Sequence, residues 1–220
     1  FALILAGYGT AQAQSTLIII PTANTIREGV YQLSLENRND TFNEDEESLW
    51  LIKAKWGFKR SEAGVSFDRD QDNEYRLYFN AKYSTPLDSR DDTALAFGIQ
   101  ALGINNTWAA YSVVSRKIDK TGLHLGIAYT DDELGWFIGA NHFIIPSLNL
   151  MADYSNTDEI EWSFGFEYSL AEHWNIKSGV RFESDATLAV IEINTSVIFN
   201  NIEFAYGFYK QPGRDHRQLT

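Results

Sequence analysis

Most of this sequence consists of segments of about ten residues in which apolar side chains alternate with Gly, Asn, Ser or charged ones. The clearest segment covers residues 160–168, where Trp162 and Phe164 belong to one set and Glu161 and Ser163 to the other. Successive side chains of a β-strand point to opposite faces, so this segment has one apolar and one polar face. Repetition of such segments along most of the chain is typical of a β-barrel.

The alternation predicts thirteen strands, separated by turn-forming or acidic stretches. Single-chain bacterial outer-membrane barrels have an even number of strands. One predicted strand is therefore wrong, or Leu17 to Ile20 forms a further strand, or a C-terminal strand is missing. We expect an all-β fold, a closed antiparallel up-and-down transmembrane β-barrel of about 12–14 strands. The predicted strands cover residues 30–37, 49–58, 62–68, 75–83, 93–102, 107–117, 122–130, 134–144, 147–155, 159–169, 174–183, 187–199 and 202–210.

The first residues resemble the end of a signal peptide, because residues 1–6 are apolar and Ala11-Gln-Ala13 is a small-x-small cleavage site. Six apolar residues are too few to cross a bilayer as a helix, although a buried strand or a short anchor stays an alternative. The expected location is the bacterial outer membrane, in the cell envelope. The expected organisation is a signal-peptide remnant at 1–13, an N-terminal segment at 14–28, an outer-membrane β-barrel at 29–210 and a polar tail at 211–220.

Alternation alone does not show which face meets lipid, because a soluble barrel buries its apolar face and a membrane barrel exposes it. Two features favour the membrane arrangement. Glycines such as Gly98, Gly139 and Gly165 occupy the polar face, which suits the crowded interior of a closed sheet. Aromatic residues fall near strand ends on the apolar face, as in the interfacial girdles of outer-membrane barrels, although aromatic residues also fill soluble sandwiches. The lipid-interface candidates are Trp50, Trp56, Tyr83, Trp136, Trp162 and Tyr168.

If the apolar face meets lipid, the polar face lines the barrel interior, here called the lumen. Carboxylates and cations are nearly balanced on that face. Such a lining either pairs across the lumen and plugs it or leaves a narrow polar path. The sequence leaves both arrangements, and the oligomeric state, open. The lumen-lining candidates are Glu36, Lys53, Lys55, Arg76, Lys82, His124, Asp153, Glu161, Glu167, Lys177, Arg181 and Glu192.

Charge and composition exclude several functions. A net charge of −12 and the lack of a basic patch argue against nucleic acid as a partner. The absence of cysteine excludes disulfides, thiol nucleophiles and Cys-zinc sites. No His-Glu-x-x-His motif or paired His spacing occurs, so we expect no cofactor and no metal centre.

An acidic hairpin tip begins like a calcium loop, with Asp68, Asp70 and Asp72 at alternate positions. The pattern then fails, because Asn73 replaces the tight-turn glycine and Phe79 stands where a bidentate Glu should close the site. We expect a solvated loop that binds divalent ions loosely at most.

Catalysis in such a barrel would need a nucleophile beside a base, as in barrel phospholipases with a His-x-Ser pair. His142 is followed by Phe143 and Ile144, so that serine is absent. His124 has no carboxylate or hydroxyl at a spacing that indicates catalysis. We therefore expect no enzymatic activity.

A series of motifs occurs in order along the chain: Ile18-Ile-Ile-Pro-Thr-Ala23, Ala94-Leu-Ala-Phe-Gly-Ile-Gln-Ala-Leu-Gly103, Tyr111-Ser-Val-Val-Ser-Arg-Lys117 and Leu123-His-Leu-Gly-Ile127. Together they resemble the YjbH-like outer-membrane barrels associated with exopolysaccharide, although Ala101 stands where that family usually has Asp. The resemblance implies an envelope barrel with outer-membrane lipid and polysaccharide or envelope secretion components as partners. Members of that family are much longer, so this chain resembles a short single-barrel form.

These observations favour an outer-membrane barrel that is either a YjbH-like component of envelope or exopolysaccharide secretion or a narrow passive pore. The alternative is a non-conducting structural or adhesion barrel with a plugged lumen and acidic surface loops. A soluble secreted barrel that binds a ligand is the third hypothesis.

Overall fold

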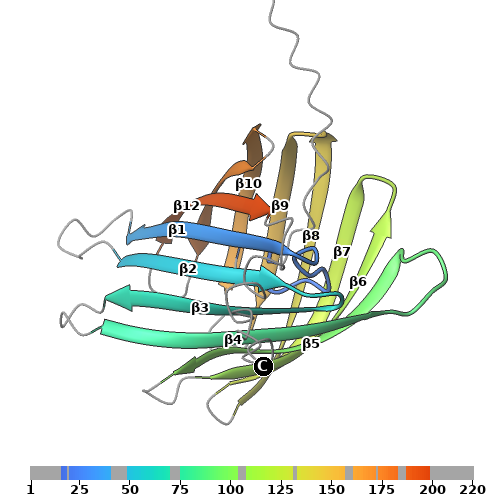
Figure 1. Ribbon diagram of the computed structural model, residues 1–220, viewed down its shortest axis with the longest axis horizontal. Helices are drawn as coiled ribbons and strands as arrows, with labels where there is room; N and C mark the ends of the chain where they lie inside the picture. The colour runs from blue at the N-terminus through green and yellow to red at the C-terminus, as the bar shows by residue number, and fades with distance from the viewer. Residues whose placement is uncertain are drawn as a thin grey trace, which may run out of the picture.

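The computed structural model describes residues 16–18, 20–40, 49–69, 75–103, 108–130, 133–156, 161–171, 173–182 and 187–198. Twelve strands of this part of the chain form one closed antiparallel barrel (Figure 1). Within the same ranges, no helix is long and apolar enough to cross a membrane. The strands are β1 (Val30–Asp40), β2 (Leu49–Gly57), β3 (Ser61–Arg69), β4 (Tyr75–Pro86), β5 (Thr93–Gly103), β6 (Ala109–Ile118), β7 (Thr121–Thr130), β8 (Glu133–Ile145), β9 (Leu148–Ser155), β10 (Glu161–Ala171), β11 (Trp174–Phe182) and β12 (Thr187–Ile198).

The barrel closes where β1 meets β12, with Val30 opposite Ile198. Every other strand pairs with the strands before and after it in the sequence, so the topology is up-and-down. The predicted closed all-β barrel is therefore confirmed, at the lower end of the predicted number of strands. The strand predicted at residues 202–210, the signal-peptide remnant and the polar tail lie outside the described residues.

The apolar face of the strands is the outer wall of the barrel. Strand β7 shows the alternation clearly. Leu125 and Ile127 are more than half exposed, whereas His124 and Ala128, on either side of this pair, are buried. Large exposed apolar side chains occur in the same way on most other strands. A wall of this kind needs an apolar solvent, because so large a continuous apolar surface is not stable in water.

The two ends of the barrel differ. At one end, called the turn end, β1 begins and the chain reverses at residues 58–60, 87–92, 119–120 and 146–147. At the opposite end, called the loop end, β1 ends at Asp40 and β2 begins only at Leu49. Outer-membrane barrels have short turns on the periplasmic side and longer loops outside, so the turn end corresponds to the periplasmic side.

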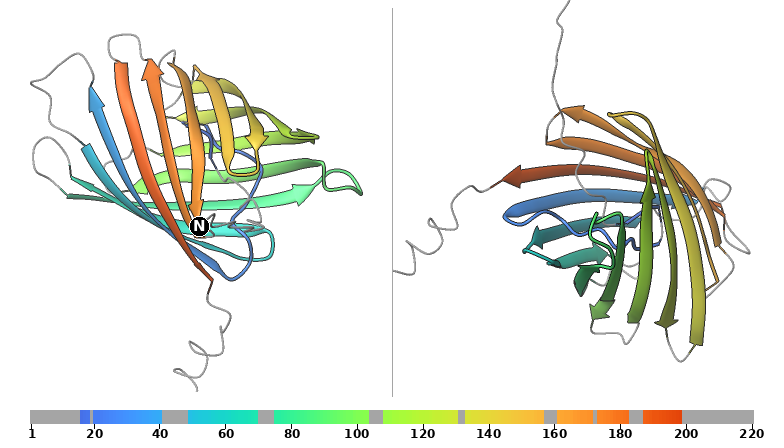
Figure 2. Two further views of the ribbon diagram at one scale, coloured as in Figure 1. Left: turned by 90° about the horizontal axis from the view of Figure 1, so that it is seen from above. Right: turned by 90° about the vertical axis from the view of Figure 1, so that its right-hand side faces the viewer.

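The described part of the predicted N-terminal segment runs inside the barrel instead of extending the sheet (Figure 2). From here on, the name N-terminal segment stands for residues 16–29. Sequence reasoning left Leu17 to Ile20 as a candidate for a further strand. The described residues of that stretch form only an isolated bridge, between Thr16 and Pro21, and the sheet closes without them. Next to this bridge, the N–H of Leu17 donates a hydrogen bond to the carbonyl of Ile20, at 2.9 Å.

A pair of glycines lets the segment pass from the lumen into β1. Gly29 has a φ of 76°, in the left-handed region that glycine adopts without strain, and its N–H donates to the carbonyl of Gly57. A Cβ on Gly57 would collide with the backbone carbonyls of Ile26 and Arg27. The chain can turn into the first strand only because both positions lack a side chain.

Candidate functional site: a lumen filled by the N-terminal segment

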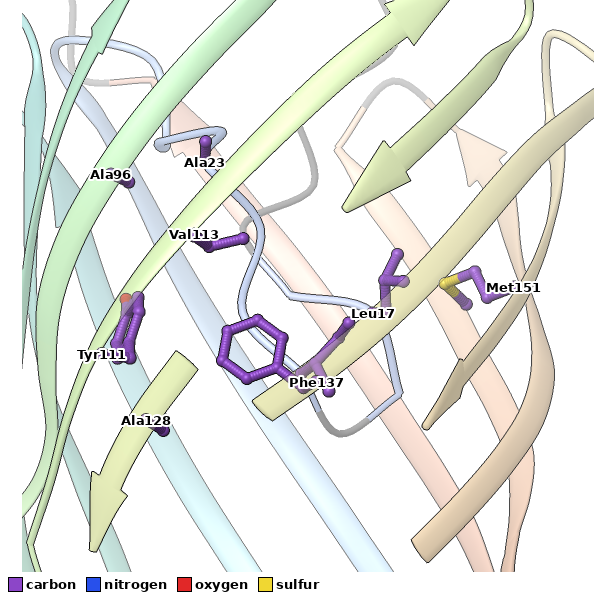
Figure 3. Packing of buried hydrophobic residues seen from close by; sticks show 9 residues of the cluster. Leu17, Ala23, Ala96, Tyr111, Val113, Ala128, Phe137 and Met151 are labelled. Atoms are coloured by element: carbon purple, nitrogen blue, oxygen red, sulfur yellow. The ribbon is translucent and has the colours of Figure 1, made fainter. Parts of the chain in front are cut away.

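Apolar side chains of the N-terminal segment pack against one half of the lumen wall. Leu17, Ile20 and Ala23 are at most 2% exposed and form a cluster with residues of β5 to β9. Figure 3 shows Leu17 between Phe137 and Met151, and Ala23 beside Ala96 and Val113. We call this half of the lumen, formed by the inward residues of β5 to β9, the apolar wall. Its members are Ala96, Tyr111, Val113, Ala128, Phe137 and Met151.

Glycines on the polar face of the strands make room for these contacts. A Cβ on Gly139 would lie 2.6 Å from the terminal methyl carbons of Leu17 and Ile20. A Cβ on Gly165 or Gly179 would lie 2.6 or 2.9 Å from the terminal methyl carbon of Ile18. Contacts this close do not occur between carbon atoms, so the three glycines form slots for the side chains of the segment.

Other glycines receive side chains of the wall itself. Gly98 lies opposite Tyr111 across β5 and β6, and Gly126 lies opposite Phe137 across β7 and β8. A Cβ on either glycine would overlap the aromatic ring of its partner. Both rings therefore lie flat over the strand beside them, an arrangement that covers a strand glycine and fixes the register.

Polar side chains of the barrel bind the backbone of the segment. The N–H of Ile18 donates to Asp153 Oδ2 at 2.9 Å, and the N–H of Ile26 donates to Glu62 Oε2 at 2.9 Å. The N–H of Ala23 donates to Ser115 Oγ at 2.7 Å. The barrel thus supplies the acceptors that these buried backbone groups need.

Two lysines complete the set by donating to backbone carbonyls of the segment. Lys177 Nζ lies 3.1 Å from the carbonyl oxygen of Leu17, and Lys82 Nζ lies 3.3 Å from that of Thr22. At Leu17–Ile18 and at Thr22–Ala23, the carbonyl and the N–H of one peptide unit are thus bound by side chains of different strands. We call Asp153, Ser115, Glu62, Lys177 and Lys82 the backbone anchors.

The anchoring lysines are held by carboxylates. Lys82 Nζ lies 3.2 Å from Glu62, and Lys177 Nζ lies 3.2 Å from Glu192. Lys53 bridges Glu192, at 3.8 Å, and Glu36, with which it forms a short ion pair. The side chains of Glu36 and Glu192 come from β1 and β12, where the two residues are direct cross-strand partners. The two carboxylates at the closing seam of the barrel are therefore neutralised by two lysines, Lys53 and Lys177.

Charged residues line the remaining half of the lumen. We call this half, formed by the inward residues of β1 to β4 and β10 to β12, the charged wall. Arg181 and Glu161 pair across β10 and β11, and Glu167 lies opposite Lys177 in the same pair of strands. Lys55 lines the cavity described below, and Arg76 lies opposite Asp68 in register. The twelve lumen-lining candidates predicted from alternation are distributed over both walls, and that they line a path for a solute stays a prediction.

A row of hydrogen bonds links the segment to the apolar wall. Ser115 Oγ lies 2.7 Å from His124 Nδ1, His124 Nε2 lies 3.0 Å from Asn141 Oδ1, and Asn141 Nδ2 donates to Asn149 Oδ1 at 3.0 Å. A hydroxyl, an imidazole and an amide in a row also occur in hydrolases. Here the serine oxygen is buried and accepts the N–H of Ala23, so the row holds the segment in place.

Sequence reasoning missed this row, because it found no hydroxyl at a meaningful spacing from His124. The correction follows from the hairpin: Ser115 and His124 are cross-strand partners on either side of the turn at 119–120. Glu62 was missed as well, although it shares the alternation of Gly64 and Ser66 on β3. Pairing residues about the short turn would have found Ser115, and extending the alternation of β3 would have found Glu62.

The N-terminal segment lines two cavities of the lumen. The cavity at the loop end has a volume of about 450 Å³, and its lining includes Thr16, Ile18, Lys53, Tyr111, Glu161 and Arg181. The cavity at the turn end has a volume of about 220 Å³, and its lining includes Thr22, Asn24, Asp92, Lys120, His124 and Phe143.

Two further predictions concern the outer wall and the acidic hairpin. Trp136, Tyr154 and Trp162 form an aromatic row near the loop end, with ring centroids 4.9 and 4.5 Å apart. Of the six lipid-interface candidates, five are well exposed and Trp56 is half-buried. Asp70 and Asp72 lie outside the described residues, and in the part of the chain that is described no group of three potential ligands gathers for a metal ion.

No family profile and no curated protein sequence matches this chain. Solved structures match its fold along almost their whole length. The KdgM porin has a TM-score of 0.62 at 11% identity, covering 76% of this chain and 99% of that one. The structure of the KdgM porin in complex with disordered oligogalacturonate has a TM-score of 0.60. The outer membrane protein Omp33 of Acinetobacter baumannii gives 0.52 at 10% identity, covering 77% and 99%.

This chain has the fold of an outer-membrane porin. Together with the apolar outer wall, that fold makes it an outer-membrane β-barrel. Identities near 10% carry no information about a permeant solute. The resemblance to YjbH-like barrels stays a prediction.

Proposed function

We propose that this protein is a passive pore of the outer membrane that its N-terminal segment holds closed. The observation that carries the proposal is the position of the N-terminal segment inside the barrel, where residues from its part 16–21 line the cavity at the loop end and residues from its part 22–24 line the cavity at the turn end. The segment is attached by backbone anchors and side-chain slots, and it is part of no strand of the sheet. It can therefore leave the lumen without breaking the barrel.

Withdrawal of the segment toward the turn end would join the two cavities into one path. The path would be lined on one side by the apolar wall and on the other by the charged wall. Cations and carboxylates pair with each other on the charged wall, so the open lumen would show little preference between anions and cations. No chemical step and no cofactor is involved.

Single-channel currents in planar bilayers test the proposal. The double variant Leu17→Asp, Ile20→Asp places charges in the apolar cluster, so we expect the segment to leave the lumen and stepwise currents to appear. The natural chain should show few or no steps under the same voltage. The matched control is Asn24→Asp, Thr25→Asp, which adds the same charge to less buried positions of the same segment and should stay closed.

A folded double variant without currents would contradict the proposal and favour the alternative, a non-conducting structural or adhesion barrel. Folding is checked by heat-modifiable mobility of the barrel in gels. A leaky Asn24→Asp, Thr25→Asp control would contradict it too, because the closed state would then not depend on the apolar contacts.

The role in envelope polysaccharide secretion is a second candidate, which the resemblance to YjbH-like barrels implies. The cavity at the loop end supports it, because its polar lining includes Asn80 and Gln100 next to the phenol rings of Tyr78 and Tyr111. Aromatic rings beside hydrogen-bonding groups suit sugar rings. Neutral and acidic oligosaccharides should block the open double variant equally, because the charged wall is balanced; the absence of any block would contradict this role.

The outer-membrane location has its own test. Phe164 is 54% exposed on the outer wall of β10, so Phe164→Arg would place a charge in the lipid. We expect a loss of about 2–4 kcal/mol in the free energy of unfolding, measured by urea titration in lipid vesicles. Phe164→Leu is the control and should change stability little. Equal stability of both variants would contradict a lipid-facing Phe164.

A further inference from the structure

The lumen recognises the backbone of the segment and not the identity of most of its side chains. Three anchors accept N–H groups, from Ile18, Ala23 and Ile26, and two anchors donate to the carbonyls of Leu17 and Thr22. All five anchors are side chains of the barrel. A separate peptide that bends in the same way offers the same N–H and carbonyl groups, and main-chain hydrogen bonds are the usual source of affinity in peptide recognition.

Side-chain selectivity comes from the glycine slots. The slot at Gly139 receives the ends of Leu17 and Ile20, and the slot at Gly165 and Gly179 receives the end of Ile18. Gly139 lies between its cross-strand partners His124 and Asp153, and the side chains of Leu17 and Ile20 that it receives belong to the apolar cluster. An acidic side chain there would be desolvated beside the carboxylate of Asp153, so this slot selects uncharged apolar residues.

We propose that the lumen is a peptide-binding site, which the N-terminal segment occupies in cis and which accepts a separate peptide with branched apolar residues and the same bend when the segment is absent. This inference rests on the proposed function and names the class of solute that the open pore would bind. The segment is then a built-in competitor of that solute. The ligand is recognised by its backbone and by two or three apolar side chains.

Covalent attachment explains why such a site stays filled. A segment joined to β1 by a short linker has an effective concentration in the millimolar range. A free peptide of equal intrinsic affinity would have to reach similar concentrations to displace it from the natural chain. In a variant whose own segment has been expelled, the same peptide should bind at much lower concentration.

The test adds synthetic peptides to the open double variant Leu17→Asp, Ile20→Asp in planar bilayers. A peptide with the sequence of residues 16–26 should block the current. The same peptide with Asp in place of Leu17 and Ile20 should need at least about tenfold higher concentration, because it cannot fill the slots. A third peptide carries N-methyl groups at the positions of Ile18, Ala23 and Ile26, which removes the three donors, and it too should block at least about tenfold less well.

The outcomes separate this inference from the proposed function. Currents that the natural peptide does not block would overturn the peptide site and leave the closed pore intact. Equal block by the N-methylated peptide would also overturn it, since the lumen would then bind any apolar chain without its backbone. If the double variant carries no current, the proposed function itself fails. Leu17→Asn, Ile20→Asn is a neutral second variant for the same measurements in case the aspartates disturb folding.

Discussion

The two walls of the lumen hold the same segment by different means. The apolar wall, from β5 to β9, packs against the side chains of Leu17, Ile20 and Ala23. The charged wall holds carbonyl and N–H groups through Lys82, Lys177 and Glu62, whose charges are neutralised by partners in the barrel. The comparison shows how a polar lumen can bind an apolar peptide: the apolar wall removes most of its side chains from water, and the charged wall satisfies its backbone together with Asp153 and Ser115 of the apolar wall.

The difference also explains why the barrel interior needs both glycine and charge. Slots on the inward faces of β8, β10 and β11 bring the backbone of the segment close enough for the anchors to reach it. The anchors in turn cannot be replaced by apolar residues without leaving buried backbone groups unsatisfied. Substitutions in the glycine slots or the apolar cluster should therefore weaken packing, whereas substitutions of the anchors should leave buried backbone groups unsatisfied.

The largest expected effect is on the apolar wall. Phe137 is 1% exposed and its ring covers Gly126, so Phe137→Ala should lower the free energy of unfolding by about 3–5 kcal/mol through loss of packing and a cavity. Urea titration in lipid vesicles measures the loss. The control Phe137→Leu preserves most of the volume and should cost less than about 1.5 kcal/mol. Equal losses in both variants would mean that packing on this wall is not what stabilises the site.

The next effect is on the charged wall. Lys82→Met removes the partner of Glu62 and one donor to the segment. We expect the free energy of unfolding to fall by about 3 kcal/mol. This is the lower end of the range for a buried pair, because both residues line a polar cavity. Adding Glu62→Gln should restore much of the stability, because the remaining buried charge disappears. A double variant as unstable as Lys82→Met alone would show that the carboxylate is not the cause.

The smallest effect concerns the hydrogen bond that joins the segment to the apolar wall. Ser115→Ala leaves the buried N–H of Ala23 without its acceptor and should cost about 1–3 kcal/mol. Ser112→Ala, on the opposite face of the same strand, should change stability by less than about 0.5 kcal/mol. The same urea titration compares the two serines, and equal effects would contradict the assignment of Ser115 as an anchor.

Alternation along the strands was enough to predict the fold and the two faces of the sheet. Ser163, for example, lies on the buried face of β10 and Trp162 on the exposed face, as their order in the sequence indicates. The residues on either side of a short turn, such as Ser115 and His124, are also within reach of sequence reasoning, because the turn fixes their register.

The position of the N-terminal segment could not be predicted in this way. Four apolar residues after Thr16 have the pattern of a short buried strand, and periodicity does not distinguish a strand in a sheet from a segment packed inside a barrel. The decisive contacts join residues far apart in sequence: Ile18 and Asp153 are 135 residues apart, and Lys177 and Leu17 are 160 apart. Only the closed barrel brings them together.

The most direct test of the central claim, that the segment lies inside the lumen, is a disulfide between residues 23 and 115. The chain contains no cysteine, so Ala23→Cys, Ser115→Cys has only one intramolecular pair to form. In the natural chain the backbone nitrogen of Ala23 is 2.7 Å from Ser115 Oγ, so the two residues are in direct contact. Oxidation of the barrel in membranes should protect both thiols from an alkylating reagent that is added after the barrel has been denatured. The pair Ala23→Cys, Val114→Cys, whose second thiol points to the outer wall, should stay reactive. Unprotected thiols at 23 and 115 would contradict the account.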